Sequence, residues 1–144
     1  MPIDKELIVK KLDFLNAHLS AVARMDFIEQ SFVENADIHD LVTFRLQQAV
    51  ETCIDIAAHI ITELDIPRKE TAKDAFLLLG EKKIITKELA GKLGKAADFR
   101  NRVVHGYNNF DFHLLFKDYK DDLKELAQFA AEVFHFLDTN PPGR

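Results

Sequence analysis

The sequence predicts an all-α protein, an antiparallel bundle of about five helices. Apolar residues recur at three- and four-residue steps over most of the 144 positions, which is the spacing of one helix face. No segment alternates with the two-residue period of a strand. The composition is 47% hydrophobic and 30% charged, which allows a buried core and excludes disordered and low-complexity classes. No linker divides the chain, so we predict one domain over residues 1–139 and a tail over 140–144.

The first two predicted helices are long. The first extends over about residues 4–29, and residues 31–38 are predicted to form a connector. Asp37 stands where an N-cap of the second helix belongs. That helix extends over about residues 38–64, and Pro67 follows its end.

The second half of the chain supplies three more predicted helices. A short helix covers about residues 71–79, with Gly80 as its expected left-handed C-cap. Thr86 can cap the next helix, which reaches about Val104. The last helix extends over about residues 110–137. Short connections between long helices favour antiparallel neighbours.

Arg100 interrupts the apolar face of the fourth predicted helix. It follows Leu89 by eleven residues, about three turns, and therefore falls on the buried row. A guanidinium there is costly unless it meets an anion, a carboxylate or a water-filled cleft. His105 follows at the helix end, where the macrodipole favours a protonated imidazole suited to acid–base chemistry. The two positions differ by about 140° around a helix, so they converge within one chain if the helix unwinds near Gly106.

A structural explanation of these residues also exists. Arg100 can pair with Glu51 or Asp55, two carboxylates of the otherwise apolar second helix, while His105 caps its own helix. The histidines form no metal-ligand spacing, so we predict no metal and no cofactor. Cys53 lies in an apolar stripe and is predicted to belong to the core.

The string from Arg100 to Tyr107, RNRVVHGY, contains the pattern R-x-x-x-x-H-x-Y. It resembles the signature of the HepT-like toxins in the HEPN superfamily. Residues 46–61 are similar to the central helix of that family, and the whole resemblance covers about residues 37–137.

The resemblance implies a helical bundle that forms a homodimer and brings two copies of the motif to one cleft. It implies a metal-independent endoribonuclease toxin of a type VII-like toxin–antitoxin pair, with RNA as its transient substrate. Arg100 and His105 match the catalytic pair, and Asn101 and Arg102 match flanking positions. Tyr107 matches the tyrosine to which a partner nucleotidyltransferase antitoxin transfers AMP.

These residue types suit RNA cleavage, because RNA carries its own nucleophile in the 2′-hydroxyl. A histidine can take that proton or protonate the leaving 5′-oxygen, and an arginine can hold the phosphate through two hydrogen bonds. Two-fold symmetry would supply a second pair, so that one chain contributes the base and the other the acid. AMP on Tyr107 would add bulk and negative charge beside Arg100. Phe110 and Phe112 are predicted to pack in the core, with stacking on a splayed base as the alternative.

Two other functions fit the same motif. A non-catalytic HEPN module would bind a nucleotidyltransferase or a nucleotide in the cationic pocket. A purely structural helical dimer would seal Arg100 from solvent against Glu51 or Asp55. A formal charge of −5 excludes a broad histone-like nucleic-acid coat. One cysteine, no signal peptide and no membrane-length apolar segment predict a cytoplasmic protein without a membrane partner.

Overall fold

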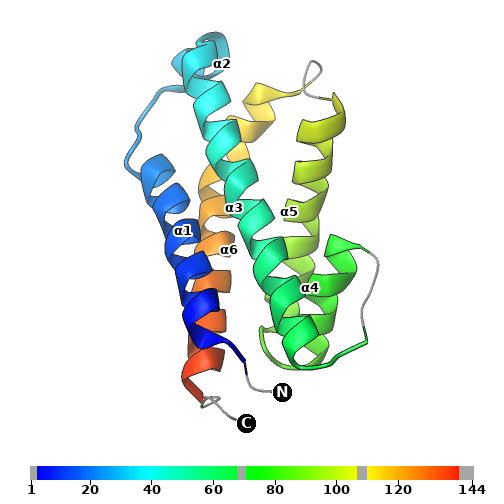
Figure 1. Cartoon of the computed structure of the whole chain (residues 1–144). Helices are drawn as coiled ribbons and strands as arrows, with labels where there is room; N and C mark the ends of the chain where they lie inside the picture. The colour runs from blue at the N-terminus through cyan, green and yellow to red at the C-terminus, as the bar shows by residue number, and fades with distance from the viewer. Residues whose placement is uncertain (1–2, 68–70, 107–109, 140–144) are drawn as a thin grey trace.

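The chain folds as an all-α bundle in a computed structural model that describes residues 3–67, 71–106 and 110–139. Within these ranges the secondary structure consists of helices: α1 (Lys5–Ala23), α2 (Glu29–Glu34), α3 (Ala36–Glu63), α4 (Ala72–Glu81), α5 (Lys87–Gly106) and α6 (Phe112–Thr139). The chain direction reverses from α1 to α3, to α5 and to α6 (Figure 1). The predicted fold class is confirmed, with six helices in place of about five.

The first predicted helix is two elements. Asp4 caps α1 by accepting a hydrogen bond from the backbone N–H of Leu7 at 3.1 Å, but α1 ends at Ala23, six residues before the predicted end. Phe27 then packs on Phe32 and on Tyr119 of α6, with ring centroids 5.6 and 6.4 Å apart. The predicted connector over residues 31–38 is largely occupied by α2 and the start of α3.

The long central helix α3 begins two residues earlier than predicted. Its N-cap is Asn35, whose side chain accepts a hydrogen bond from the backbone N–H of Asp37 at 2.9 Å. Asp37 is therefore a first-turn acid and not the cap, a position that also suits the positive end of a helix. Cys53 is fully buried in the core, as predicted.

Gly80 lies inside α4 and is not its C-cap. A Cβ at this position would meet Cβ of Ala90 at 2.9 Å, so glycine permits α4 and α5 to approach closely. The left-handed residue of this turn is Lys83, with φ 63°. Thr86 caps α5 as predicted, because its hydroxyl accepts a hydrogen bond from the backbone N–H of Leu89 at 3.2 Å.

The core joins all six helices. Its largest fully buried side chains come from every helix: Ile8, Leu15, Phe32, Leu46, Ile56, Ile60, Phe76, Leu79, Leu89, Leu93, Leu126 and Phe129. Burying such side chains supplies the dominant favourable term in folding. In the described part of the chain, no helix is long and apolar enough to span a membrane. The predicted tail, residues 140–144, lies outside the described residues.

Candidate functional site

Arg100 lies at the boundary between α5 and the central helix α3. One of its terminal nitrogens, Nη1, is 3.4 Å from Oε1 of Glu51 on α3. The Arg100 side chain is 30% exposed and the Glu51 side chain is 43% exposed, so solvent reaches this ion pair. The prediction that Arg100 meets a carboxylate of the second predicted helix is confirmed for Glu51.

The ion pair with Glu51 does not engage all the N–H donors of the Arg100 guanidinium. A guanidinium carries five N–H donors in a planar fork, and its Nε is buried without a hydrogen-bond partner among the described residues. Glu51 fixes one edge of the fork and leaves other donors available for an incoming acceptor. The purely structural alternative required Arg100 to be sealed from solvent, and its partial exposure does not meet that requirement.

Asp55 belongs to a different contact. Its carboxylate pairs with Lys11 of α1, and His59 lies 3.7 Å from its other oxygen one turn along α3. Asp55 is therefore not the partner of Arg100. Both acids lie on the outer side of α3, but Glu51 faces α5 whereas Asp55 faces α1.

The C-terminal end of α5 carries the rest of the motif. The helix continues through Gly106, so the backbone does not unwind at 104–106. Arg100 and His105 thus occupy positions about 140° apart on a continuous helix. The side chain of His105 and the whole of Tyr107 lie outside the described residues, and their predicted roles stay predictions.

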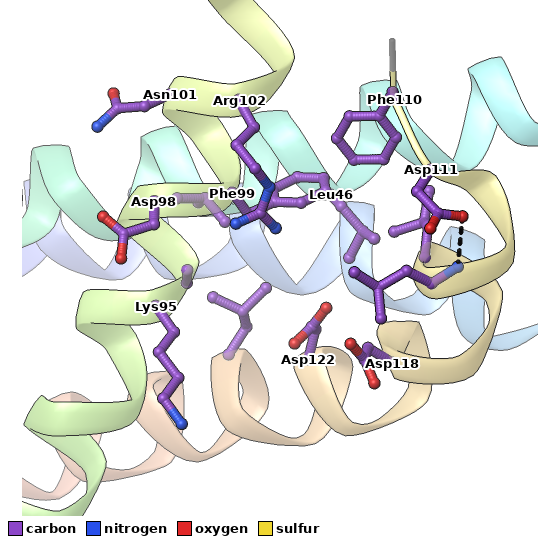
Figure 2. A pocket seen from close by; sticks show the side chains of 15 residues that line it. Leu46, Lys95, Asp98, Phe99, Asn101, Arg102, Phe110, Asp111, Asp118 and Asp122 are labelled. Carbon is purple, nitrogen blue, oxygen red and sulfur yellow. Dashed lines mark hydrogen bonds between the residues drawn. The ribbon is translucent and has the colours of Figure 1, made fainter. Parts of the chain in front are cut away.

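Asn101 and Arg102 line a cavity on the other side of α5 from Arg100. It has a volume of about 820 Å³, is partly open to solvent, and is lined by α3, α5, the first half of α6 and the segment before α6. Leu46 and Val50 of α3 contribute to its apolar lining. Figure 2 shows Arg102, Phe110, Asp118 and Asp122 directed toward its interior.

Two carboxylates of α6 in this cavity were not identified from the sequence. Asp118 and Asp122 alternate with lysines, a pattern that predicts a solvated helix face. The structure places both carboxylates, one turn apart, in the cavity wall instead. Their spacing of four residues was the available signal, since it puts them on one helix face beside Leu115 and Leu126.

The environment of Asp122 disfavours its charged form. Burial is the largest cause that raises the pKa of this carboxyl to about 6, and the nearby acids Glu125, Asp118 and Asp121 act in the same direction. The positive charge of Arg102 acts in the opposite direction but does not offset them. Near neutral pH this half-buried carboxylate is therefore held ionised at a cost in folding free energy.

We expect Asp122→Asn to raise the melting temperature by a few degrees at pH 7 and to leave it unchanged near pH 3. The pKa of Asp122 is higher in the folded chain than in the unfolded chain, so the folded state binds the proton more tightly. The unfavourable contribution is absent below the unfolded pKa and grows as the pH rises through about 6. Thermal melts from pH 3 to pH 8 test this, with Asp138→Asn as the control, because Asp138 is exposed on α6 and does not contribute to the pKa of Asp122. A melting temperature of Asp122→Asn that parallels wild type at every pH would contradict it.

The aromatic residues after α5 serve the fold, as predicted. Phe110 packs edge-on against Phe99, with ring centroids 5.7 Å apart and an interplanar angle of 84°. Phe112 stacks on His39 at 3.7 Å, and His39 Nδ1 lies 2.9 Å from the carbonyl of Phe32. Phe110 nevertheless also lines the cavity, so one of its sides remains accessible from there.

The residues described hold no group of three or more histidine, cysteine and acidic side chains arranged to bind a metal ion. The thiol of Cys53 is inert, because complete burial raises its pKa far above the usual range.

The described residues thus form an antiparallel helical bundle in which one core helix, α5, ends with the pattern Arg-x-x-x-x-His. The sequence profile described as Ribonuclease HepT-like matches residues 13–133. The chain is 26% identical over 128 residues to the protein named mRNA nuclease HepT from Shewanella oneidensis, covering 89% of this chain and 96% of that one. It is 27% identical over 138 residues to tRNA nuclease HepT from Aphanizomenon flos-aquae, covering 95% and 94% of the two chains.

A solved structure shows the same fold. It is the structure of a tri-AMPylated Shewanella oneidensis HEPN toxin in complex with MNT antitoxin. The TM-score is 0.84 at 24% identity, and the match covers 91% of this chain and 98% of that one.

The chain belongs to the Ribonuclease HepT-like family. The predicted resemblance is thus confirmed, and so is the predicted enzyme class, an RNA nuclease.

Proposed function

We propose that this protein is the ribonuclease toxin of a toxin–antitoxin pair, and that it cleaves RNA without a metal ion through Arg100 and His105. The observation that carries the proposal is the partly exposed Arg100, which retains unused donors and stands five residues before His105 in a HepT-like chain. Two relatives are named nucleases of mRNA and of tRNA, which supports RNA as the substrate class.

Arg100 is the residue we assign to the phosphate. Glu51 holds the guanidinium at 3.4 Å while its buried Nε still lacks an acceptor among the described residues. A phosphate oxygen would accept hydrogen bonds from the exposed part of the guanidinium, and the fixed fork would stabilise charge that develops on the phosphorus oxygens during cleavage. Glu51 is then a positioning residue and Arg100 a catalytic residue.

His105 is the residue we assign to proton transfer. It would take the proton of the 2′-hydroxyl or protonate the leaving 5′-oxygen, and no metal is required for either step. Because α5 stays helical through Gly106, Arg100 and His105 point from positions about 140° apart. A site composed of Arg100 from one copy and His105 from a second copy does not require the two residues to converge within one chain.

An exposed apolar patch on α1 and α3 is the surface we assign to that second copy. Phe14, Leu41 and Phe44 are 53%, 40% and 52% exposed, respectively, and Phe14 packs edge-on against His18 at 4.5 Å. On α3, Phe44 follows Leu41 by three residues and Glu51 follows Phe44 by seven. These spacings place all three residues on the outer face of the helix. A two-fold dimer through this patch would bring the two Arg100–Glu51 pairs to one interface.

We expect Phe44→Glu to raise the dissociation constant of the dimer at least about a hundredfold. The substitution places two carboxylates against apolar surface in a symmetric interface, where burial of unpaired charge is costly. Phe134→Glu on α6 is the matched control, since Phe134 is 57% exposed and lies on a different helix. Light scattering across a concentration series measures both variants, and an unchanged dimer in Phe44→Glu would contradict this interface.

A nucleotidyltransferase antitoxin is the partner we assign to Tyr107. The solved complex named above contains an AMPylated toxin and an MNT antitoxin, and Tyr107 completes the pattern R-x-x-x-x-H-x-Y of this chain. Each AMP would carry negative charge toward the Arg100 phosphate site and would compete with RNA. The non-catalytic binding module would use the same partner but would cleave nothing.

RNA cleavage in the presence of EDTA tests the proposed function. Mass spectrometry first confirms that the purified chain carries no AMP, and a broad panel of RNAs is then offered to it. We expect cleavage by the unmodified chain. A folded, unmodified chain that leaves every RNA intact would favour the binding module instead.

A further inference from the structure

The cavity between α3, α5 and α6 is not used by phosphate binding. Its lining contains four carboxylates and two cations, Lys95 and Arg102, a balance that disfavours a phosphate in its interior. One carboxylate, Asp111, is occupied as the cap of α6, because it accepts hydrogen bonds from the backbone N–H groups of His113 and Leu114. Arg102, Asp118 and Asp122 are left without an assigned role.

Donor and acceptor groups oppose each other across this cavity. Figure 2 shows the guanidinium of Arg102 on the α5 side and the carboxylates of Asp118 and Asp122 on the α6 side. Among the described ion pairs, none joins Arg102 to either acid. The cavity volume of about 820 Å³ leaves room for a ligand that presents N–H donors to the carboxylates and acceptors to the guanidinium.

The remaining lining suits a flat apolar ring. Phe99 and Phe110 form an edge-to-face pair in the wall, and aliphatic side chains from three helices line the rest, including Leu46, Val50 and Leu115. A volume of about 820 Å³ is in the usual range for a small-molecule site. Aromatic walls of this kind stack unpaired bases in RNA-binding proteins.

We propose that this cavity binds a guanine base of the RNA, which rests on the proposed ribonuclease function. Guanine presents adjacent N1–H and N2–H donors, which match a carboxylate, and its O6 and N7 acceptors match an arginine. A purely cationic ligand would be repelled by Arg102, and an anionic one by the carboxylates. Among the common bases, guanine presents both edges in this arrangement.

The base that binds here belongs to a nucleotide adjacent to the cleaved one. Arg102 follows Arg100 by two residues, which places it about 200° around α5, on the opposite side of the helix. A strand with its phosphate at Arg100 must therefore cross the C-terminal end of α5 to insert a base in the cavity. The cavity would then set a preference for guanine beside the cleavage site.

Calorimetric titration of the full chain with nucleosides tests the proposal without RNA cleavage and without phosphate. We expect guanosine to bind, inosine to bind more weakly because it lacks the 2-amino group, and adenosine and cytidine to bind weakest. Asp122→Asn is expected to weaken guanosine binding about tenfold, since a good two-bond contact discriminates by that order. Arg102→Gln, at an exposed position, is expected to weaken guanosine binding by a similar factor. Asp138→Asn is the control, because Asp138 is exposed on α6 and does not line the cavity.

Equal affinity for all four nucleosides, no guanosine binding by the folded chain, or full binding by Asp122→Asn would overturn the proposal. Tighter binding of phenethylamine than of guanosine would also overturn it, in favour of an organic cation. If the chain cleaves RNA in EDTA but does not bind guanosine, the guanine-binding proposal is wrong and the proposed nuclease function stands. If the chain binds guanosine through Asp122 but cleaves no RNA, the proposed nuclease function is wrong and the guanine-binding site stands.

Discussion

His105→Ala is expected to slow RNA cleavage by about 10²- to 10⁴-fold, because it removes the group that moves the proton in the proposed reaction. The position is the last but one of α5, where the protonated imidazole is favoured by the helix macrodipole. The rate of the wild-type chain should therefore depend on pH near neutrality, and the residual rate of the variant should lose that dependence. Single-turnover cleavage of one labelled RNA from pH 5 to pH 9 measures both quantities.

The matched control for this prediction is His135→Ala, since His135 is exposed on α6 and lies outside the motif. Circular dichroism and thermal melting establish that both variants keep the helical fold. If His105→Ala cleaves RNA at the wild-type rate, His105 has no part in the reaction. Equal losses of cleavage rate in both histidine variants would indicate damage to the fold.

Arg100→Gln is expected to lower the cleavage rate by about 10²- to 10³-fold and to leave stability nearly unchanged. The rate loss follows from removing a preorganised donor to charge on the phosphate oxygens. The stability estimate follows from the exposure of the pair, because partly exposed ion pairs such as Arg100–Glu51 contribute about 0–1 kcal/mol. Cleavage kinetics and urea unfolding of the same preparations measure the two effects.

Two further variants separate catalysis from structure at this position. Arg100→Lys keeps the charge but loses the planar fork, so we expect partial activity that falls between wild type and Arg100→Gln. Glu51→Gln keeps Arg100 and is expected to reduce activity only a few-fold, since Glu51 positions the guanidinium without touching substrate. A large loss of stability in Arg100→Gln with intact cleavage would favour a structural role.

The fold class could be predicted because helical periodicity is a local property. The three- and four-residue spacing identifies α3, α5 and α6, and Thr86 is a cap that functions as the sequence indicates. The end of α1 could not be predicted, since no Gly or Pro marks it. Beyond that end, Phe27 packs on Phe32 and on Tyr119 of α6, and the contact with Tyr119 joins residues far apart in the sequence.

The sequence indicates Arg100 on one side of α5 but does not indicate the cavity carboxylates on the other side. Arg100 could be singled out because a cation in an apolar row conflicts with its neighbours, which often marks a functional position. Glu51 and Asp55 could not be separated, because they are four residues apart on one face of α3 and only the positions of α1 and α5 distinguish them. The cavity carboxylates could not be predicted, because Asp118 and Asp122 resemble a solvated face until α5 lies against α6.

The central claim is that Arg100 and His105 cleave RNA through its own 2′-hydroxyl and without a metal. Analysis of the product ends tests it most directly. The unmodified chain is incubated with a defined RNA in EDTA, and the termini of the fragments are determined by mass spectrometry. Attack by the 2′-hydroxyl predicts a 2′,3′-cyclic phosphate on one fragment and a 5′-hydroxyl on the other, and His105→Ala is expected to form both about 10²- to 10⁴-fold more slowly. Fragments with 5′-phosphate ends, or cleavage that appears only when a divalent metal is restored, would contradict the account.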